Sequence, residues 1–249
     1  MIEVNNLYKS FGDLEVLKDI TATFENGKTS VIIGASGSGK STLARCLVGL
    51  VEPNKGEVLY DGRSFLDLNV KQRKSLRKEV GFLFQGGALF DYMTVEENIR
   101  FPLDMLTKLS KKEKKHRVDT VLDRVELSNA HKLYPSELSG GMKKRVGIAR
   151  AISPNPRYLF CDEPNSGLDP QTSIIIDDLI LEITREYDIT TLVITHDMNS
   201  VMEIGEHIIF IHKGQKWWEG TKEEILETDN KELLSFVDAS GFLTNKKNK

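Results

Sequence analysis

The segment "GASGSGKST" at residues 34–42 limits the fold of this 249-residue chain more than any other feature. It matches the pattern G-x-x-x-x-G-K-[ST], it follows the apolar run "VII" at 31–33, and it leads into an amphipathic segment at 41–50. A buried strand that passes through a glycine-rich loop into a helix forms a cradle of backbone N–H groups at the positive end of that helix. The segment therefore predicts a phosphate-binding loop within an α/β fold.

The chemistry of such a loop assigns roles to its residues. Backbone amides surround the phosphate oxygens, the Lys40 ammonium reaches the terminal phosphates, and the Ser41 hydroxyl binds Mg²⁺. The predicted phosphate-contacting residues are Gly34, Ala35, Ser36, Gly37, Ser38, Gly39, Lys40, Ser41 and Thr42.

Two acidic residues, Asp162 and Glu163, follow the apolar run "YLFC". A carboxylate at the end of a buried strand beside a phosphate loop can hold Mg²⁺, and Asp162 suits that role. Glu163 is left to polarise the attacking water as a general base. His196 follows another apolar run. Because parallel strands deliver their C-terminal ends to one crevice, we expect these three side chains to lie close to Lys40.

Alternating buried strands and helices predict a single domain with a parallel α/β core of the P-loop type. Short strand patterns in the first thirty residues predict an N-terminal antiparallel β region. We expect residues 1–85 and 157–249 to form the core with this β region, and residues 86–156 to form an inserted α-helical subdomain.

Two capping-box pairs predict helix starts in the helical block. Thr94 is followed by Glu97 and Ser110 by Glu113, each at the spacing of that motif. Near the C-terminus, "TKEEILE" is expected to open a last helix, and the final "NKKNK" reads as a loose tail.

Composition restricts the partners. A formal charge of −3 and a pI near 6.0 provide no overall basic field, so we expect no nucleic-acid partner. Basic runs at 71–78 and 108–117 are interpreted as solvated helix faces, with contact to anionic headgroups as the alternative.

Cys46 and Cys161 lack metal-type spacing and are expected to pack as small apolar residues in a reducing compartment. Without an apolar run of about 18 residues or a signal peptide, any membrane role is expected to come through a partner.

Seven motifs, taken in chain order, resemble those of the ATP-binding subunits of ABC transporters. They are Phe11, "GASGSGKS", Gln85, "LSGGM", "LFCDEP", "SGLD" and His196. The resemblance covers nearly the whole chain and implies a P-loop ATPase fold, with ATP and Mg²⁺ as cofactors and hydrolysis of ATP as the reaction.

The resemblance implies that this site is shared between two chains. The "LSGG" segment of the family starts a helix and faces the ATP held by the opposite subunit, so Ser139, Gly140 and Gly141 are expected to hold the γ-phosphate in trans. A helix N-terminus of small residues is a suitable anion site. A homodimer with two sandwiched nucleotides follows.

Other roles carry over by position in the family motifs. Phe11 corresponds to the aromatic residue that stacks on adenine, with packing in the core as the alternative. Gln85 corresponds to the glutamine that contacts Mg²⁺ and the water and joins the core to the helical subdomain. His196 would hold the γ-phosphate, and Asp169 belongs to the loop that crosses the dimer interface. Gly167 departs from the commoner alanine of that loop.

The region after Gln85 resembles one subfamily. It contains "GALF" and "NIRFPL", and together with "KKRVGIARAI" these resemble the ATPases of Mla/Mce phospholipid-trafficking systems, although the "GG" at 86–87 departs from the usual Ser-Gly. This resemblance implies a permease contact between Gln85 and Pro102, a lipid-binding Mce-type subunit in the complex, and a peripheral position on the cytoplasmic face of the inner membrane. The soluble ABC classes of DNA repair and translation fit less well, because the chain has neither a long coiled-coil insertion nor a second cradle.

Three alternatives stay open. One is the ATPase of a lipoprotein-release or cell-division complex that works mechanically, and another is a nucleotide-gated binding module without turnover. The third concerns the C-terminal segment "ELLSFVDASGF", which is expected either to pack on its own domain or to reach the other subunit.

Overall fold

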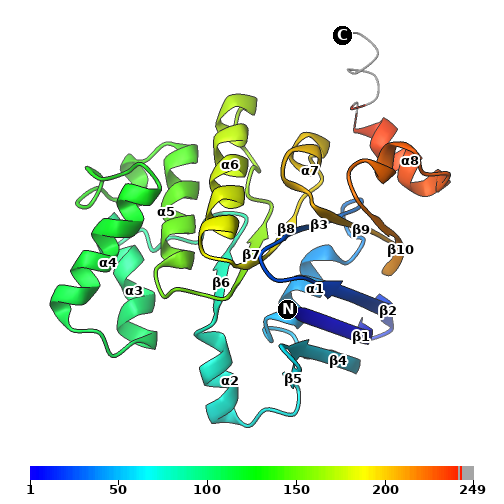
Figure 1. Cartoon of the computed structure of the whole chain (residues 1–249), viewed down its shortest axis with the longest axis horizontal. Coiled ribbons are helices and arrows are strands. Elements are labelled where there is room, and N and C mark those ends of the chain that lie inside the picture. Colours follow the sequence, from blue (N-terminus) through cyan, green and yellow to red (C-terminus); the bar gives the residue numbers. More distant parts are fainter. Residues whose placement is uncertain (241, 243–249) are drawn as a thin grey trace.

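The computed structural model of the chain describes residues 1–240 and 242, and its larger sheet has six strands in the order β10-β9-β3-β8-β7-β6 (Figure 1). Strands β3, β6, β7, β8 and β9 are parallel to their neighbours, and β10 pairs antiparallel with β9. The predicted tail "NKKNK" lies outside the described residues. The strand bounds are β3 Thr29–Ile33, β6 Val80–Leu83, β7 Tyr158–Asp162, β8 Thr190–Ile194, β9 His207–His212 and β10 Gln215–Gly220.

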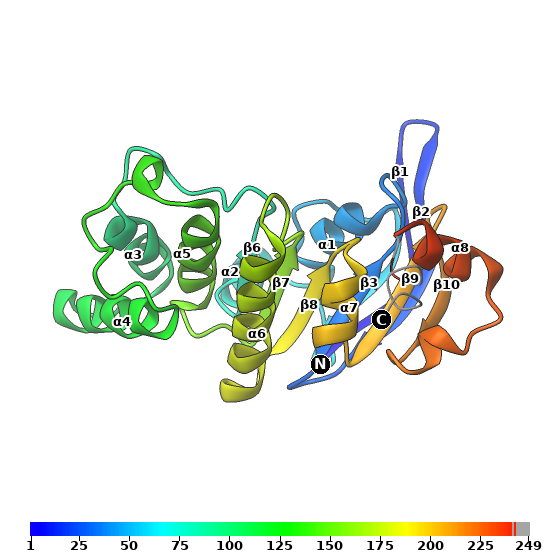
Figure 2. The same ribbon diagram turned by 90° about the horizontal axis from the view of Figure 1, so that it is seen from above.

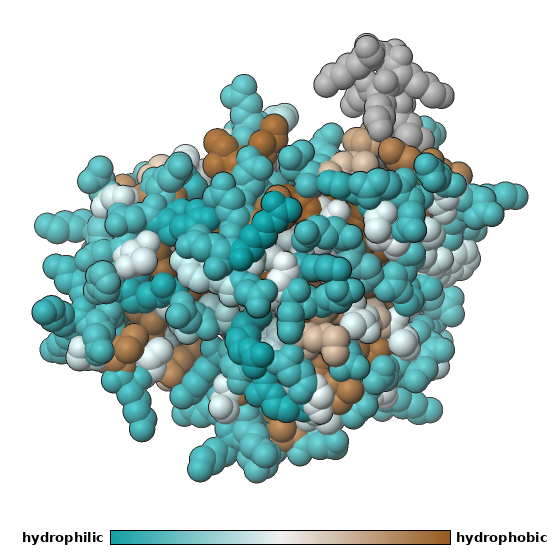
Figure 3. Space-filling view, in the orientation of Figure 1, coloured by the Kyte–Doolittle hydropathy of each residue, from teal (hydrophilic) through white to brown (hydrophobic). Residues whose placement is uncertain are grey.

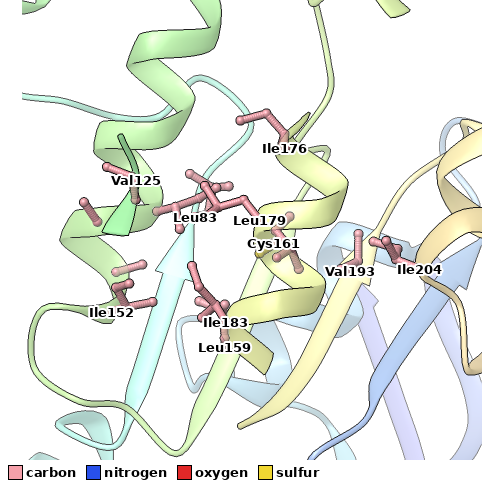
Figure 4. Close-up of a cluster of buried hydrophobic side chains, with 14 of the residues drawn as sticks. Leu83, Val125, Ile152, Leu159, Cys161, Ile176, Leu179, Ile183, Val193 and Ile204 are labelled. Carbon is pink, nitrogen blue, oxygen red and sulfur yellow. The ribbon is translucent and has the colours of Figure 1, made fainter. Parts of the chain in front are cut away.

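The central strands are apolar on both faces because both faces are covered. In β3, Val31 and Ile33 belong to one core cluster and Ile32 to a second, as expected when successive side chains point to opposite sides of a sheet. Strands β7 and β8 divide in the same way. Figure 4 shows part of the first cluster, where Leu159 of β7 packs near Ile183.

A smaller antiparallel sheet forms the N-terminal region and has the order β2-β1-β4-β5. Its apolar residues join the second core cluster together with helix α1, so α1 is packed between this sheet and the larger one. The antiparallel region was correctly predicted. Its strands are β1 Ile2–Phe11, β2 Leu14–Phe24, β4 Lys55–Tyr60 and β5 Arg63–Ser64.

Helices α6 and α7 cover the face of the larger sheet opposite α1, and α3, α4 and α5 group at one end of the molecule (Figures 1 and 2). This arrangement is that of an α/β P-loop fold, as the sequence predicted. The helices are α1 Lys40–Leu47, α2 Val70–Arg77, α3 Val95–Leu106, α4 Lys111–Arg124, α5 Gly140–Ile152, α6 Pro170–Glu186, α7 Met198–Ile204 and α8 Lys231–Ala239, with 3₁₀ turns at Pro135–Glu137 and Glu224–Leu226.

Both predicted capping boxes are present. The Thr94 and Ser110 side chains each accept a hydrogen bond from the N–H three residues later, and the glutamates reach back to the cap N–H. The prediction for "TKEEILE" was wrong, because this segment forms only a 3₁₀ turn, with Glu224 bonded back to Thr221. The last helix begins later, where Asn230 caps α8.

Helix α8 packs on its own domain. Its Leu233 and Val237 are fully buried in the first core cluster. Cys46 and Cys161 are buried free thiols, as predicted. The face in Figure 3 is mainly hydrophilic, with apolar residues in separate patches. Among the described residues, no helix combines the length and apolar character needed to cross a membrane.

Candidate active site

A cavity of about 660 Å³ opens where the loop before α1 meets the C-terminal ends of β6, β7 and β8. These strand ends meet at one edge because the strands are parallel. Most of the predicted site residues line this cavity: Ala35, Ser36, Gly37, Gly39, Lys40, Ser41, Thr42, Gln85, Glu163 and His196. The structure therefore brings together residues from four separate segments of the sequence.

The loop requires glycine where the backbone passes close to its neighbours. Gly39 has φ +108°, and a Cβ there would lie 2.8 Å from the Val16 carbonyl oxygen. Gly34 has φ +149°, and its Cβ would lie 2.2 Å from the Ile211 carbonyl oxygen. Both positions exclude other residues, because the φ value and the contact are each unfavourable to a side chain. Gly34 and Ser38 support the loop from behind and are not in the cavity wall.

Lys40 lies buried within the loop. Its Nζ donates to the carbonyl oxygens of Gly34 at 2.7 Å and Ala35 at 2.9 Å. Burial lowers the pKa of the ammonium, and the nearby Glu163 and Asp162 carboxylates act in the opposite direction. A buried cation in a glycine-rich loop at the start of a helix fits a phosphate group, which would supply the missing negative charge.

Ser41 of the cavity wall contacts Asp162, which does not itself line the cavity. The Ser41 hydroxyl donates to Asp162 Oδ1 at 3.2 Å, and burial raises the pKa of the Asp162 carboxyl. Hard oxygen ligands beside a phosphate site suit Mg²⁺, which usually keeps several waters and uses few protein ligands. Within the described part of the chain, no group of three His, Cys, Asp or Glu side chains could hold a metal ion alone. The fit is therefore to Mg²⁺ together with a phosphate.

Glu163 and His196 form a pair at the cavity wall. His196 Nδ1 lies 2.9 Å from Glu163 Oε1, and the Glu163 N–H donates to the Ile194 carbonyl oxygen of β8 at 2.8 Å. Glu163 has φ +51°, an uncommon value for a non-glycine residue, which sites of function often hold. The side chain of His196 is 68% exposed and that of Glu163 is 15% exposed. The carboxylate is thus oriented by the imidazole and still reaches the cavity.

The predicted signature residues lie elsewhere. Ser139 caps α5, where its Oγ accepts from the Met142 N–H at 3.2 Å, and Gly140 and Gly141 form the first turn. None of the three lines the cavity of its own chain. A Cβ on Gly141 would lie 2.6 Å from Thr172 Cγ2, so the start of α5 touches the start of α6.

Two further predicted residues are also outside the cavity. Asp169 caps α6, with Oδ1 accepting from the N–H groups of Gln171 at 3.1 Å and Thr172 at 2.9 Å. Phe11, at the end of β1, is 51% exposed, and its ring faces the Lys9 ammonium. Val16 of β2 lines the cavity in its place, and the adenine contact of Phe11 stays a prediction.

The sequence reasoning missed two contributions to the site. Phe236 and Ala239 of α8 and the Ser240 that follows it line the cavity, although they lie far from every motif in the sequence. Lys144 of α5 reaches the backbone of Gln85 and Glu163. Only the charge of Lys144 at an otherwise buried helix position could have signalled it.

The fold and the cavity define the class of a P-loop ATPase. The family model described as ABC transporter matches residues 17–166. The dimeric structure of MJ0796, a bacterial ABC transporter cassette, superposes with a TM-score of 0.82 at 33% identity, covering 89% of this chain and 98% of that one. A second structure of the MJ0796 cassette, in a post-hydrolysis state bound to ADP and Pi, is 32% identical with a TM-score of 0.81 and the same coverage.

Curated relatives agree with this match. "Methionine import ATP-binding protein MetN 4" of Oceanobacillus iheyensis is 42% identical over 244 residues, covering 96% of this chain and 70% of that protein. "Probable ribonucleotide transport ATP-binding protein mkl" of Mycobacterium bovis is 37% identical over 237 residues and 95% of this chain, which spans 66% of the length of that relative.

The chain therefore belongs to the ABC transporter family. ATP with Mg²⁺ is the cofactor of this cavity, and hydrolysis of ATP to ADP and phosphate is its chemistry.

Proposed function

We propose that the chain is the ATP-hydrolysing subunit of an ABC transporter, which closes as a homodimer on ATP and drives a membrane permease. The observation that carries this proposal is the grouping of Lys40, Ser41, Glu163 and His196 around one cavity, with Asp162 hydrogen-bonded to Ser41. Each side chain supplies a function that transfer of a phosphoryl group to water requires, namely charge stabilisation, metal binding and orientation of the nucleophile.

In this mechanism Glu163 accepts a proton from the water as the water oxygen bonds to the γ-phosphorus. The bond from that phosphorus to the bridging oxygen breaks, and ADP leaves. Lys40 and the loop amides stabilise the charge on the phosphate oxygens. Mg²⁺, held by Ser41 and Asp162 with Gln85 nearby, would supply further charge neutralisation. His196 holds Glu163 through Nδ1, which leaves Nε2 for the γ-phosphate.

Replacement of Glu163 tests this assignment. Glu163→Gln keeps the shape and removes the base, so we expect ATP to bind normally while hydrolysis falls about 100-fold or more and the closed dimer accumulates. Phosphate release, nucleotide binding and size-exclusion chromatography with ATP measure the three effects.

Glu203→Gln is the control, because Glu203 is an exposed glutamate outside the cavity wall. Near-normal hydrolysis by Glu163→Gln would contradict the base assignment. A wild-type chain that binds ATP without releasing phosphate would favour the nucleotide-gated binding module instead.

The homodimer is supported by the position of Ser139, Gly140 and Gly141. These residues form the N-terminus of a 13-residue helix, and they do not line the cavity of their own chain. We infer that they hold the γ-phosphate bound by the opposite chain, and that Asp169 lies in the loop that crosses the interface. Phe11 would stack on adenine.

The permease contact is proposed for residues 85–102. Its exposed aromatic residues support the proposal, since Tyr92 is 74% exposed and Phe101 is 37% exposed, and both rings pack on Phe90. Clusters of exposed aromatic residues are typical of protein interfaces. The helices α3, α4 and α5 would form the subdomain that transmits closure of the dimer, with the complex on the cytoplasmic face of the inner membrane.

We propose phospholipid as the transported substrate, because the segments "GALF" and "NIRFPL" resemble those of phospholipid-trafficking ATPases. The names of two relatives state other cargoes, ribonucleotide and methionine. A mechanical ATPase of lipoprotein release or cell division is the second candidate, because the same region resembles those systems.

Purification of the tagged chain from gently solubilised membranes separates these candidates. Mass spectrometry that finds a multi-span permease, an Mce-type lipid-binding subunit and bound phospholipid supports lipid trafficking. A permease without such a subunit or lipid would leave the ABC assignment and remove the phospholipid proposal.

A further inference from the structure

Lys144 is a buried cation between the helical region and the catalytic cavity. It lies in the second turn of α5 with 5% of its surface exposed. Its Nζ donates to the backbone carbonyl oxygen of Gln85, and to that of Glu163 at 3.1 Å. One ammonium therefore joins α5 to Gln85, two residues after β6, and to Glu163, the residue after β7.

A second cation on α5 extends this contact along the same loop. Arg150 donates through Nη1 to the Ala88 carbonyl oxygen and through Nη2 to that of Gly87, both at 2.7 Å. Gly87 and Ala88 both have positive φ, so their carbonyl groups turn out of any regular hydrogen-bond ladder. The loop at 85–88 thus has three carbonyl oxygens bound by α5.

Burying the Lys144 ammonium costs free energy, so we infer that this group does more than fill space in the core. Burial lowers its pKa, and a leucine or methionine would fill the same space without desolvating a charge. Hydrogen bonds from the ammonium to carbonyl oxygens offset part of this desolvation free energy when the carbonyl groups are held in place. The acceptors here are the backbones of the two residues assigned to the metal and the water.

We propose that Lys144 is a positioning residue, which fixes the backbones of Gln85 and Glu163 relative to the start of α5. The inference rests on the proposed ATPase function. It means that Ser139, five residues before Lys144, moves as one unit with the loop of Gln85 and with the catalytic carboxylate. Closure of the dimer on Ser139 would then set the Glu163 geometry as well.

Two substitutions at Lys144 and one beside it test this role in the full chain. Lys144→Met keeps the length and loses both hydrogen bonds, whereas Lys144→Arg keeps the donors. Lys143→Met is the matched control, because Lys143 is half-buried and its ammonium donates no hydrogen bond within the described part of the chain.

We expect Lys144→Met to lower kcat about 10- to 100-fold, since small displacements of catalytic groups have effects of that size. The Mg²⁺ concentration for half-maximal hydrolysis should rise about tenfold, as when an outer partner of a metal ligand is lost. ATP binding in the absence of Mg²⁺ should stay within about twofold, because Lys144 does not touch the phosphate loop. Lys144→Arg should recover most of the activity.

The opposite pattern overturns the inference. If Lys144→Met hydrolyses ATP like the wild type, with the same Mg²⁺ dependence, the hydrogen bonds have no positioning role. If both Lys144 variants lose activity only in proportion to a lower unfolding temperature, the residue is structural. Failure of the wild-type chain to hydrolyse ATP would refute the proposed function instead, and nucleotide binding by the same preparation distinguishes that case from a misfolded sample.

Discussion

Asp177 of α6 is a buried carboxyl group whose ionisation lowers the stability of the folded chain. Its side chain is 3% exposed, and its Oδ1 has no hydrogen-bond partner within the described residues. Burial raises its pKa from an ordinary 3.8 to about 6, and the polar groups of Ser200 and Asn165 act in the opposite direction. The folded state therefore binds this proton more tightly than the unfolded chain.

A stability measurement at two pH values tests this. The favourable contribution of the protonated form is complete below pH 3.8 and is lost as the pH rises through about 6. Ionised Asp177 then costs up to about 3 kcal/mol at pH 7.5. We expect Asp177→Asn to stabilise the chain by about 1–3 kcal/mol at pH 7.5 and by much less at pH 4.5, in urea unfolding. The exposed Asp123→Asn is the control, and an equal effect of Asp177→Asn at both pH values would contradict the shift.

At the scale of one element, Asn98 connects helix α3 to the segment before it. The side chain is fully buried, and its Oδ1 accepts from the Phe90 N–H at 2.8 Å. Its Nδ2 lies within 3.1 Å of the carbonyl oxygens of Phe90, Met93 and Thr94. One amide therefore satisfies much of the backbone between Phe90 and the cap of α3, in the region proposed to contact the permease.

Asn98→Ala should destabilise this region. The substitution leaves buried backbone groups without partners, which costs about 2–4 kcal/mol in total. Urea unfolding measures this loss, and the exposed Asn129→Ala should change stability by less than about 0.5 kcal/mol. If both variants unfold at the same urea concentration, the Asn98 network does not stabilise the fold.

At the scale of the whole molecule, the cavity and the signature segment are separated in one chain. The loop of Lys40 lies in the core, and Ser139 caps a helix that is packed on the other side of β6 and β7. If Ser139 holds the γ-phosphate as proposed, a complete set of phosphate-binding groups would require a second chain.

Mixing two inactive variants tests that requirement. Lys40→Ala removes the phosphate lysine, and Ser139→Arg blocks the signature segment, so each homodimer should be inactive. A mixed dimer contains one site with the Lys40 of one chain and the Ser139 of the other, and hydrolysis should return on mixing. Both variants must remain folded by circular dichroism. If mixing restores no phosphate release while the mixed dimer forms, the site works within one chain.

Local chemistry allowed the phosphate loop and the two capping boxes to be predicted from the sequence. The glycines of residues 34–39 and the pairs Thr94–Glu97 and Ser110–Glu113 act over a few residues, so their spacing is sufficient. The meeting of Lys40, Asp162, Glu163 and His196 was also predictable, because the C-terminal ends of parallel strands lie at one edge.

Only the tertiary structure decided which distant side chains enter these sites. Lys144 and Asp177 each lie on a helix whose polar pattern does not reveal that they are buried, and their partners come from other segments. The contact of α8 with the cavity depends in the same way on how a late helix packs on the finished sheet. The sequence by itself determined the class of fold and the reacting groups, since these follow from local spacing and strand direction. The side chains that position those groups are set by packing between elements, and a local sequence pattern does not indicate that packing.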